Sequence, residues 1–304
     1  NPIVYAPVGT VSLGAGSTVV DGIFSLNGSD YITIDGIDLV DNNASAPGTM
    51  EYGYALYKAS ATDGCSNNVI QNCNITLNKA NSSSGPSTFM PGSRGIFSGN
   101  CTRIAIGTVL TITTVGGRND NNKFLGNTIS NVFAGIILRG YNYATPSTYF
   151  DQGNVIGAIG AGNTITNYGG SSANTGYGVY CIYQNAVNIS YNTINNRLGG
   201  VTHTNTLYGI FISANTGNIT NSITVSNNDI SLGQGAISQT IFAIRTGSGG
   251  YVAGSINITN NTIHDCSFDA GASGQFYGIY QEYDCTSSYI DDNIIKNNAL
   301  NTTG

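Results

Sequence analysis

A short motif recurs along the whole chain and limits the folds that it can adopt. The motif is asparagine, one variable residue and isoleucine, with copies beginning at Asn127, Asn163, Asn192, Asn228, Asn261 and Asn293. Asp35-Gly36-Ile37 and Cys73-Asn74-Ile75 fit the same register with a changed first residue. Successive isoleucines of the motif are 29 to 54 positions apart. Self-similarity at such a period predicts units that stack on one another, with the asparagines forming a ladder.

A second motif alternates with the first. It is a small residue followed by two larger ones, at Gly22, Gly53, Gly95, Gly135, Gly178, Gly209, Ala243 and Gly278. Between the motifs apolar and polar residues alternate, as in 187–194, which is the period of a strand with one buried face. Each repeat is therefore expected to be one coil of strands and turns. The glycines would supply a positive φ or a close approach at a tight bend.

These motifs resemble those of right-handed parallel β-helix proteins of the pectate-lyase-like architecture, and residues 27–37 look like a first complete coil. The Asn-, Thr- and Gly-rich composition with Tyr-Gly-Ile segments is similar to long secreted or surface proteins of Bacteroidetes-type bacteria. We therefore expect an all-β, right-handed parallel β-helix of about eight coils. It would form a single domain over 1–304 within a longer chain, with an N-terminal segment (1–20), repeat coils (21–298) and a continuation or tail (299–304).

The coils differ most where loops are inserted between residues 78 and 176. The loop at 140–153 is rich in aromatic residues, namely Tyr141, Tyr143, Tyr149 and Phe150. Inserted loops of solenoids often carry recognition, so this loop is a candidate ligand-binding site for a glycan or a protein. The alternative is that its rings fold back over the solenoid wall.

The composition excludes several classes of function. Ten Lys and Arg against 16 Asp and Glu give a net charge of −6, which does not suit a nucleic-acid surface. No apolar stretch is long enough for a membrane span. Six cysteines without a Cys-x-x-Cys pair, and two histidines, do not indicate a zinc site, and no cofactor is expected. Only 9% of residues are charged, which suits stacked coils because like charges in register repel.

An enzyme on this scaffold would act on an acidic polysaccharide, as a hydrolase or a lyase. Hydrolysis needs two suitably spaced carboxyl groups, and the candidates are Asp229, Asp291, Asp292 and Glu282. Asp291 and Asp292 are adjacent, so on a strand they would point to opposite faces. A lyase needs a base such as arginine, but we interpret Arg94, Arg139 and Arg245 as solvated surface residues.

The sequence thus favours a non-enzymatic, extracellular structural or adhesive β-solenoid of a bacterial secreted or surface protein. It would serve as a stalk, fibre or filament subunit. The expected partners are flanking coils of the same chain or other copies stacked end to end, with a glycan or surface ligand as a further candidate. The alternatives that stay open are a polysaccharide lyase or glycoside hydrolase, and a carbohydrate-binding module.

Overall fold

The structure is a computed structural model of the 304-residue chain. It describes residues 3–5, 11–13, 22–41, 50–82, 92–142, 147–170, 174–197, 203–213, 219–235, 239–247, 252–268, 274–282 and 284–300.

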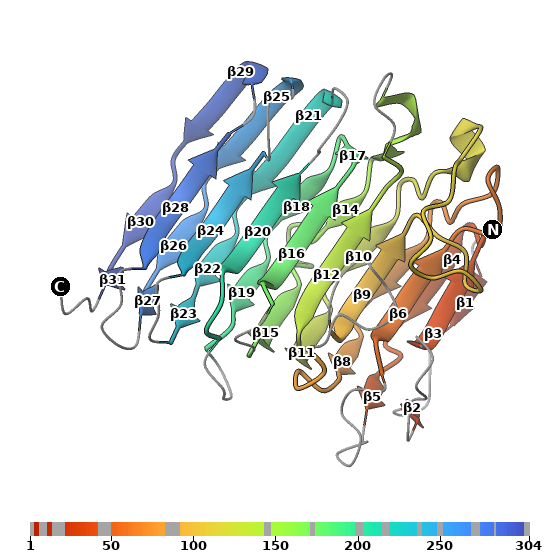
Figure 1. The fold of residues 1–304 in the computed structure, drawn as a ribbon, viewed down its shortest axis with the longest axis horizontal. Coiled ribbons are helices and arrows are strands. Elements are labelled where there is room, and N and C mark those ends of the chain that lie inside the picture. Colours follow the sequence, from red (N-terminus) through yellow and green to blue (C-terminus); the bar gives the residue numbers. More distant parts are fainter. Residues whose placement is uncertain are drawn as a thin grey trace.

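The strands form three long parallel sheets that wind into a right-handed parallel β-helix (Figure 1). Sheet 1 consists of β1 (Ile3–Tyr5), β4 (Ile32–Asp35), β7 (Val69–Gln71), β10 (Lys123–Leu125), β14 (Val155–Ile156), β18 (Asn188–Ser190), β21 (Ile219–Ser226), β25 (Val252–Thr259) and β29 (Asp284–Asp291). Sheet 2 consists of β2 (Val11–Leu13), β5 (Leu39–Asp41), β8 (Asn74–Thr76), β11 (Thr128–Val132), β15 (Thr164–Tyr168), β19 (Thr193–Asn195), β22 (Asp229–Ser231), β26 (Thr262–His264) and β30 (Ile294–Lys296). Sheet 3 consists of β3 (Gly22–Asn27), β6 (Tyr52–Tyr57), β9 (Arg94–Gly99), β12 (Ala134–Arg139), β16 (Gly176–Ile182), β20 (Leu207–Ser213), β24 (Thr240–Thr246) and β28 (Gln275–Gln281).

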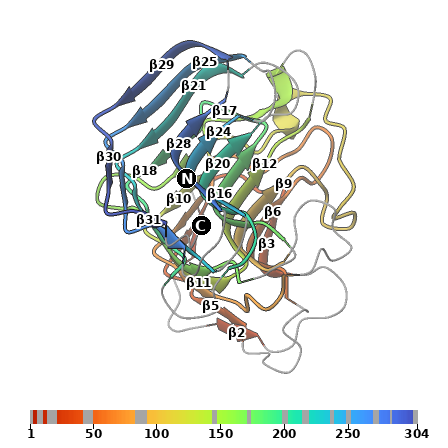
Figure 2. The same ribbon diagram turned by 60° about the vertical axis from the view of Figure 1, so that its left-hand side comes forward.

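Each coil contributes one strand to each sheet in the order 1, 2, 3. Figure 2 shows the result after a turn, with β21, β25 and β29 side by side on one wall and β20, β24 and β28 on another. Two smaller parallel sheets extend the corners, one of β13 (Asp151–Gln152) with β17 (Gln184–Asn185) and one of β23 (Gly233–Gln234), β27 (Ser267–Phe268) and β31 (Ala299–Leu300). In the described part of the chain, helix is limited to the single turns η2 (Val115–Gly117) and η3 (Ser147–Tyr149).

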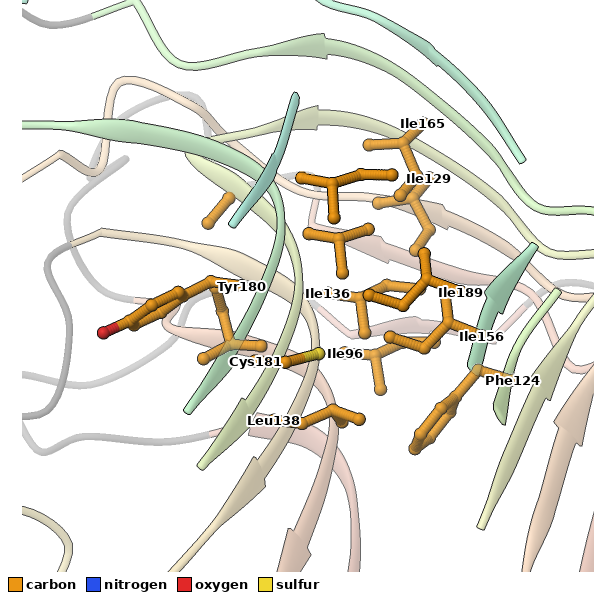
Figure 3. Close-up of a cluster of buried hydrophobic side chains, with 14 of the residues drawn as sticks. Ile96, Phe124, Ile129, Ile136, Leu138, Ile156, Ile165, Tyr180, Cys181 and Ile189 are labelled. Atoms are coloured by element: carbon orange, nitrogen blue, oxygen red, sulfur yellow. The ribbon is translucent and has the colours of Figure 1, made fainter. Parts of the chain in front are cut away.

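Isoleucine dominates the interior because most coils place a β-branched residue at the same position of each sheet, with Leu39 and Phe124 among the exceptions. In sheet 2, Ile129 pairs with Ile75 on one side and with Ile165 on the other, and all three are fully buried. Figure 3 shows Ile129 and Ile165 in one cluster of buried side chains with the sheet 1 residue Ile189 and the sheet 3 residue Ile136. Stacking about 4.8 Å apart therefore gives one continuous apolar core that no single coil could bury.

The pairing register of the strands shows that the first copy of each motif was misaligned in the sequence analysis. Leu39, not Ile37, pairs with Ile75, so Ile37 rather than Asp35 takes the ladder position of its coil. The misalignment arises because Gly36, with φ 72°, makes a turn that resembles the motif. In sheet 3, Gly22 pairs with Tyr52, so Ile23 lies level with Gly53 and the first glycine is displaced by one residue.

The chain before residue 21 contributes to the solenoid. Strand β1 pairs with β4 and β2 pairs with β5, so the segment that we placed ahead of the coils supplies two strands of the first coil. At the other end, β31 reaches Leu300 and pairs with β27.

Candidate functional site

The asparagines of the motif form a hydrogen-bonded ladder at the corner between sheets 1 and 2. In Asn163, the backbone N–H and Nδ2 both donate to Asn192 Oδ1, at 3.0 and 2.9 Å. Its Nδ2 also donates to the carbonyl of Phe124 in the preceding coil, at 2.8 Å. The same three bonds recur at Asn127, Asn192, Asn228 and Asn261, and the ladder ends at Asn293. Each buried amide is thus satisfied and ties three coils together.

A turn in the left-handed region precedes the ladder in several coils. Gly126, Tyr191, Asn227, Asn260 and Asp292 stand directly before ladder asparagines and have φ of 53 to 62°. Asparagine and glycine tolerate this region, which explains the frequent Asn-Asn pairs in the sequence. The glycines of the second motif play a different part, since they lie inside sheet 3 and permit close approach of the next coil.

A second, shorter ladder was missed from the sequence. Asn68 Nδ2 donates to Asn122 Oδ1 at 3.0 Å, and the Asn122 backbone N–H donates to Asn154 Oδ1 at 2.9 Å. Asn154 Nδ2 in turn donates to Gln184 Oε1 at 2.8 Å. These asparagines also stand two residues before a buried core residue, as in Asn154-Val155-Ile156. That spacing is the signal that could have found them.

The four candidate catalytic acids are distributed over different sheets. Asp229 begins β22 in sheet 2, Glu282 follows β28 in sheet 3, and Asp291 ends β29 in sheet 1. Asp292 makes the corner after β29, and its backbone N–H donates to Asp291 Oδ1 at 2.9 Å. Glu282 Oε2 accepts from Arg245 Nη2 at 2.8 Å. Asp229 lies two coils from the level of Asp292, roughly 10 Å along the axis at the strand spacing of a sheet.

Asp229 belongs to a charged cluster that the sequence did not indicate. His264 Nε2 donates to Asp229 Oδ1 at 2.7 Å, and Nδ1 donates to Asp265 Oδ2 at 2.6 Å. The hydrogen bonds to Asp265 and then to Asp229 raise the pKa of His264. A carboxylate at each ring nitrogen favours the protonated imidazole, and both nitrogens are engaged in hydrogen bonds, which does not suit a general base.

We expect the pKa of one histidine to lie below the ordinary histidine value of 6.5 and the pKa of the other to lie above it. Burial lowers the pKa of His203 to about 4, while that of His264 is raised. The His264 contribution to stability should be complete below pH 6.5 and be lost as the pH rises through its folded pKa. The His203 contribution should be present above pH 6.5 and be lost as the pH falls towards 4. NMR titration of the two ring Cε1–H signals would measure both values.

The variant Asp229→Asn provides the control for this titration. It should lower the pKa of His264 and leave His203 unchanged, since His203 lies on another part of the solenoid with Gly170 and Thr206 as its ring partners. Titration of both rings near 6.5 would contradict the assignment.

The rings of the 140–153 loop pack mainly against the protein. Phe150 is fully buried, with its ring 5.5 Å from that of Tyr183, and Tyr141 is also buried. Tyr149 is half-buried, its ring centroid is 6.4 Å from that of Tyr141, and its hydroxyl donates to Thr113 O. Tyr143 lies outside the described residues. Phe150 therefore offers no face to a ligand in this structure, and the binding role of the loop stays a prediction.

The arginines of sheet 3 are partly or wholly covered, which corrects our interpretation of them as solvated. Arg94 is 1% exposed and its guanidinium lies 4.9 Å from the ring centroid of Tyr52. Arg245 stacks on Phe211 and Phe242 at 5.1 and 5.0 Å. Because aromatic faces attract cations, these rings stabilise charges that the sequence suggested were hydrated.

The outer side of sheet 3 also carries a column of stacked rings. Tyr177, Tyr208, Phe242 and Tyr277 follow one another at 5.0 to 5.2 Å with interplanar angles of 5 to 9°. Figure 3 shows the neighbouring Tyr180 pointing away from the isoleucine core, opposite to Cys181. Since the ring faces cover one another, mainly ring edges and hydroxyls face outward. This arrangement stabilises the stack and does not provide ring faces for sugars.

The six cysteines are free, and five of them are buried. Burial raises the pKa of Cys65 to about 11 and that of Cys101 to about 12, so these thiols behave as small apolar side chains. Among the described residues, no cluster of three or more His, Cys, Asp or Glu could hold a metal ion. A search of the same residues for a helix long and apolar enough to span a membrane also found none. Comparison of the chain with protein-family models, curated proteins and solved structures gave no match.

Proposed function

We propose that the chain is a non-enzymatic, extracellular β-solenoid of a bacterial secreted or surface protein, where it acts as a stalk, fibre or filament subunit. The observation that carries the proposal is the exposure of two isoleucine side chains in the coil that contains β29 and β30. Ile290 and Ile295 occupy the core columns of sheets 1 and 2 but are 48% and 51% exposed. Their counterparts one coil earlier, Ile258 and Ile263, are fully buried.

The exposed coil has the features of a stacking surface. Strands β28, β29 and β30 are edge strands, each at one end of its sheet. The backbone groups of an edge strand pair readily with a further strand. Asn293 is the ladder residue of this coil, and its Oδ1 accepts from the backbone N–H and Nδ2 of Asn261, as at the earlier steps of the ladder. These features support coil-on-coil association, either with flanking coils or with another copy.

The distribution of ionisable groups supports a structural role over catalysis. The candidate acids lie on separate sheets, and two of them already bind His264 or Arg245. Catalysis of glycoside hydrolysis requires two carboxyl groups that face one bond. Hydrolysis or lysis of pectin or alginate by the purified chain would contradict the proposal.

We expect concentration-dependent self-association that the variant Ile295→Lys weakens. A lysine in an exposed core column would place a charge in the stacking surface, which disfavours burial against another coil. Light scattering over a concentration series, with electron microscopy of the same samples, would measure the effect. The matched control is Ile104→Lys, because Ile104 is 96% exposed in a turn away from the last coil. A strictly monomeric chain at high concentration would argue against a filament subunit.

A further inference from the structure

Lys58 and Asp151 meet in the interior at the corner where sheet 3 leads into sheet 1. Lys58 directly follows β6, and Asp151 begins β13. They are 93 positions apart in sequence, yet Lys58 Nζ lies 3.2 Å from Asp151 Oδ1. Both side chains are fully buried. Burial of two charges is costly unless every proton and lone pair finds a partner.

The lysine does not have enough acceptors for an ammonium group. An ammonium has three protons to donate, and among the described residues the one acceptor of Lys58 Nζ is Asp151 Oδ1. An amide nitrogen at the same place would carry a single proton. The hydrogen-bonding capacity of the site therefore suits an amide better than an ammonium.

The carboxyl group, in contrast, is held by fixed donors. The Asn119 backbone N–H donates to Asp151 Oδ1 at 2.9 Å. The Gln184 side chain lies beyond the other oxygen, with Nε2 3.5 Å from Asp151 Oδ2, and is anchored by Asn154 at 2.8 Å. Burial raises the pKa of Asp151, which favours the neutral acid. A neutral acid beside an amine is the reactant state for amide formation.

We propose that Lys58 and Asp151 condense to an isopeptide bond in the folded protein. The ammonium passes one proton to the carboxylate across the 3.2 Å contact, which leaves an amine and a carboxylic acid. Nζ then attacks Cγ, a C–N bond forms, and the bond from Cγ to Oδ1, the oxygen that received the proton, breaks. Oδ1 leaves as water with two of the three ammonium protons, one proton stays on the amide nitrogen, and Oδ2 becomes the amide oxygen. No oxidant, reductant or cofactor takes part.

Two properties of the site favour the reaction. The fold holds nucleophile and carboxyl group in contact, which replaces an improbable encounter by an intramolecular step. Negative charge develops on Oδ2 in the tetrahedral intermediate, and Gln184 Nε2 faces this oxygen as a donor, while the Asn119 N–H holds Oδ1 in place. Asn119 and Gln184 are thus positioning residues, and the dry surroundings protect the product from hydrolysis.

The experiment is the intact mass of the purified, denatured and reduced chain. We expect a mass lower than that of the sequence by one water molecule, and a branched peptide pair in a protease digest that joins Lys58 to Asp151 by tandem mass spectrometry. The full sequence mass for the folded protein, with separate Lys58 and Asp151 peptides, would overturn the proposal and leave a plain buried ion pair.

Two lysine variants make the test specific. Lys58→Arg keeps the charge but cannot form the amide, so it should show its full sequence mass. Lys123→Arg, at an exposed lysine on β10, should keep the deficit of one water. A deficit that persists in Lys58→Arg would indicate dehydration elsewhere, such as a succinimide, and would refute the proposal. Should Lys58→Arg fail to fold, the branched peptide of the unaltered chain still decides between the outcomes.

Discussion

Replacement of Asn192 by alanine is expected to lower the free energy of unfolding by about 3 to 5 kcal/mol, since it removes several bonds to buried partners. Asn192 Oδ1 accepts from both the backbone and the side chain of Asn163, and Nδ2 donates to Asn228 and to the carbonyl of Ile156. Without these groups the buried Asn163 N–H has no acceptor. Chemical denaturation monitored by circular dichroism would measure the loss.

Thr193→Ala provides the matched control for this prediction. Thr193 is the next residue on β19, but its side chain is exposed, so the effect should stay within about 0.5 kcal/mol. The contrast between neighbouring residues separates the ladder from strand propensity. Similar denaturation midpoints for the two variants would mean that the ladder contributes little net stability.

The ladder and the core columns could be predicted because they repeat at one position in six successive coils. An asparagine two residues before a buried isoleucine needs only the period to be recognised. The asparagines of the second ladder also stand two residues before a buried core residue. However, Ile32 and Val187 occupy the ladder position in the coils on either side, and the two residues that follow the asparagine are not the same in every coil. A column of three asparagines does not stand out in a chain that contains many others.

Contacts between distant segments were beyond the reach of the repeat pattern. Lys58 follows β6 and Asp151 follows the inserted loop of a later coil, so they meet at one corner although no periodic signal links positions 93 apart. The burial of Arg94 likewise depends on Tyr52 of the neighbouring strand β6, in addition to Phe97 of its own strand β9. Whether an arginine is solvated depends on its neighbours in the stack, and its own sequence context does not reveal them.

The second large effect is expected at the glycine column of sheet 3. A Cβ at Gly135 would lie 2.3 Å from the carbonyl oxygen of Gly178 and 2.6 Å from Ile165 Cγ2. The oxygen belongs to the backbone of the next coil, so relief requires the coils to separate. We expect Gly135→Ala to lower the free energy of unfolding by about 3 kcal/mol, at the upper end for an overpacked core. Denaturation midpoints would measure it.

Gly278→Ala tests the same substitution where the stack is open. The three atoms nearest to its Cβ would all belong to the side chain of Ile295, the nearest at 2.8 Å, and Ile295 is half-exposed and free to move. The loss should stay below about 1 kcal/mol. Ala243 stands in the same column, so a methyl group is compatible with the fold where the surrounding coils have adjusted to it. If Gly135→Ala proved as mild as Gly278→Ala, coil spacing would be adjustable throughout, and close approach would not explain the glycines.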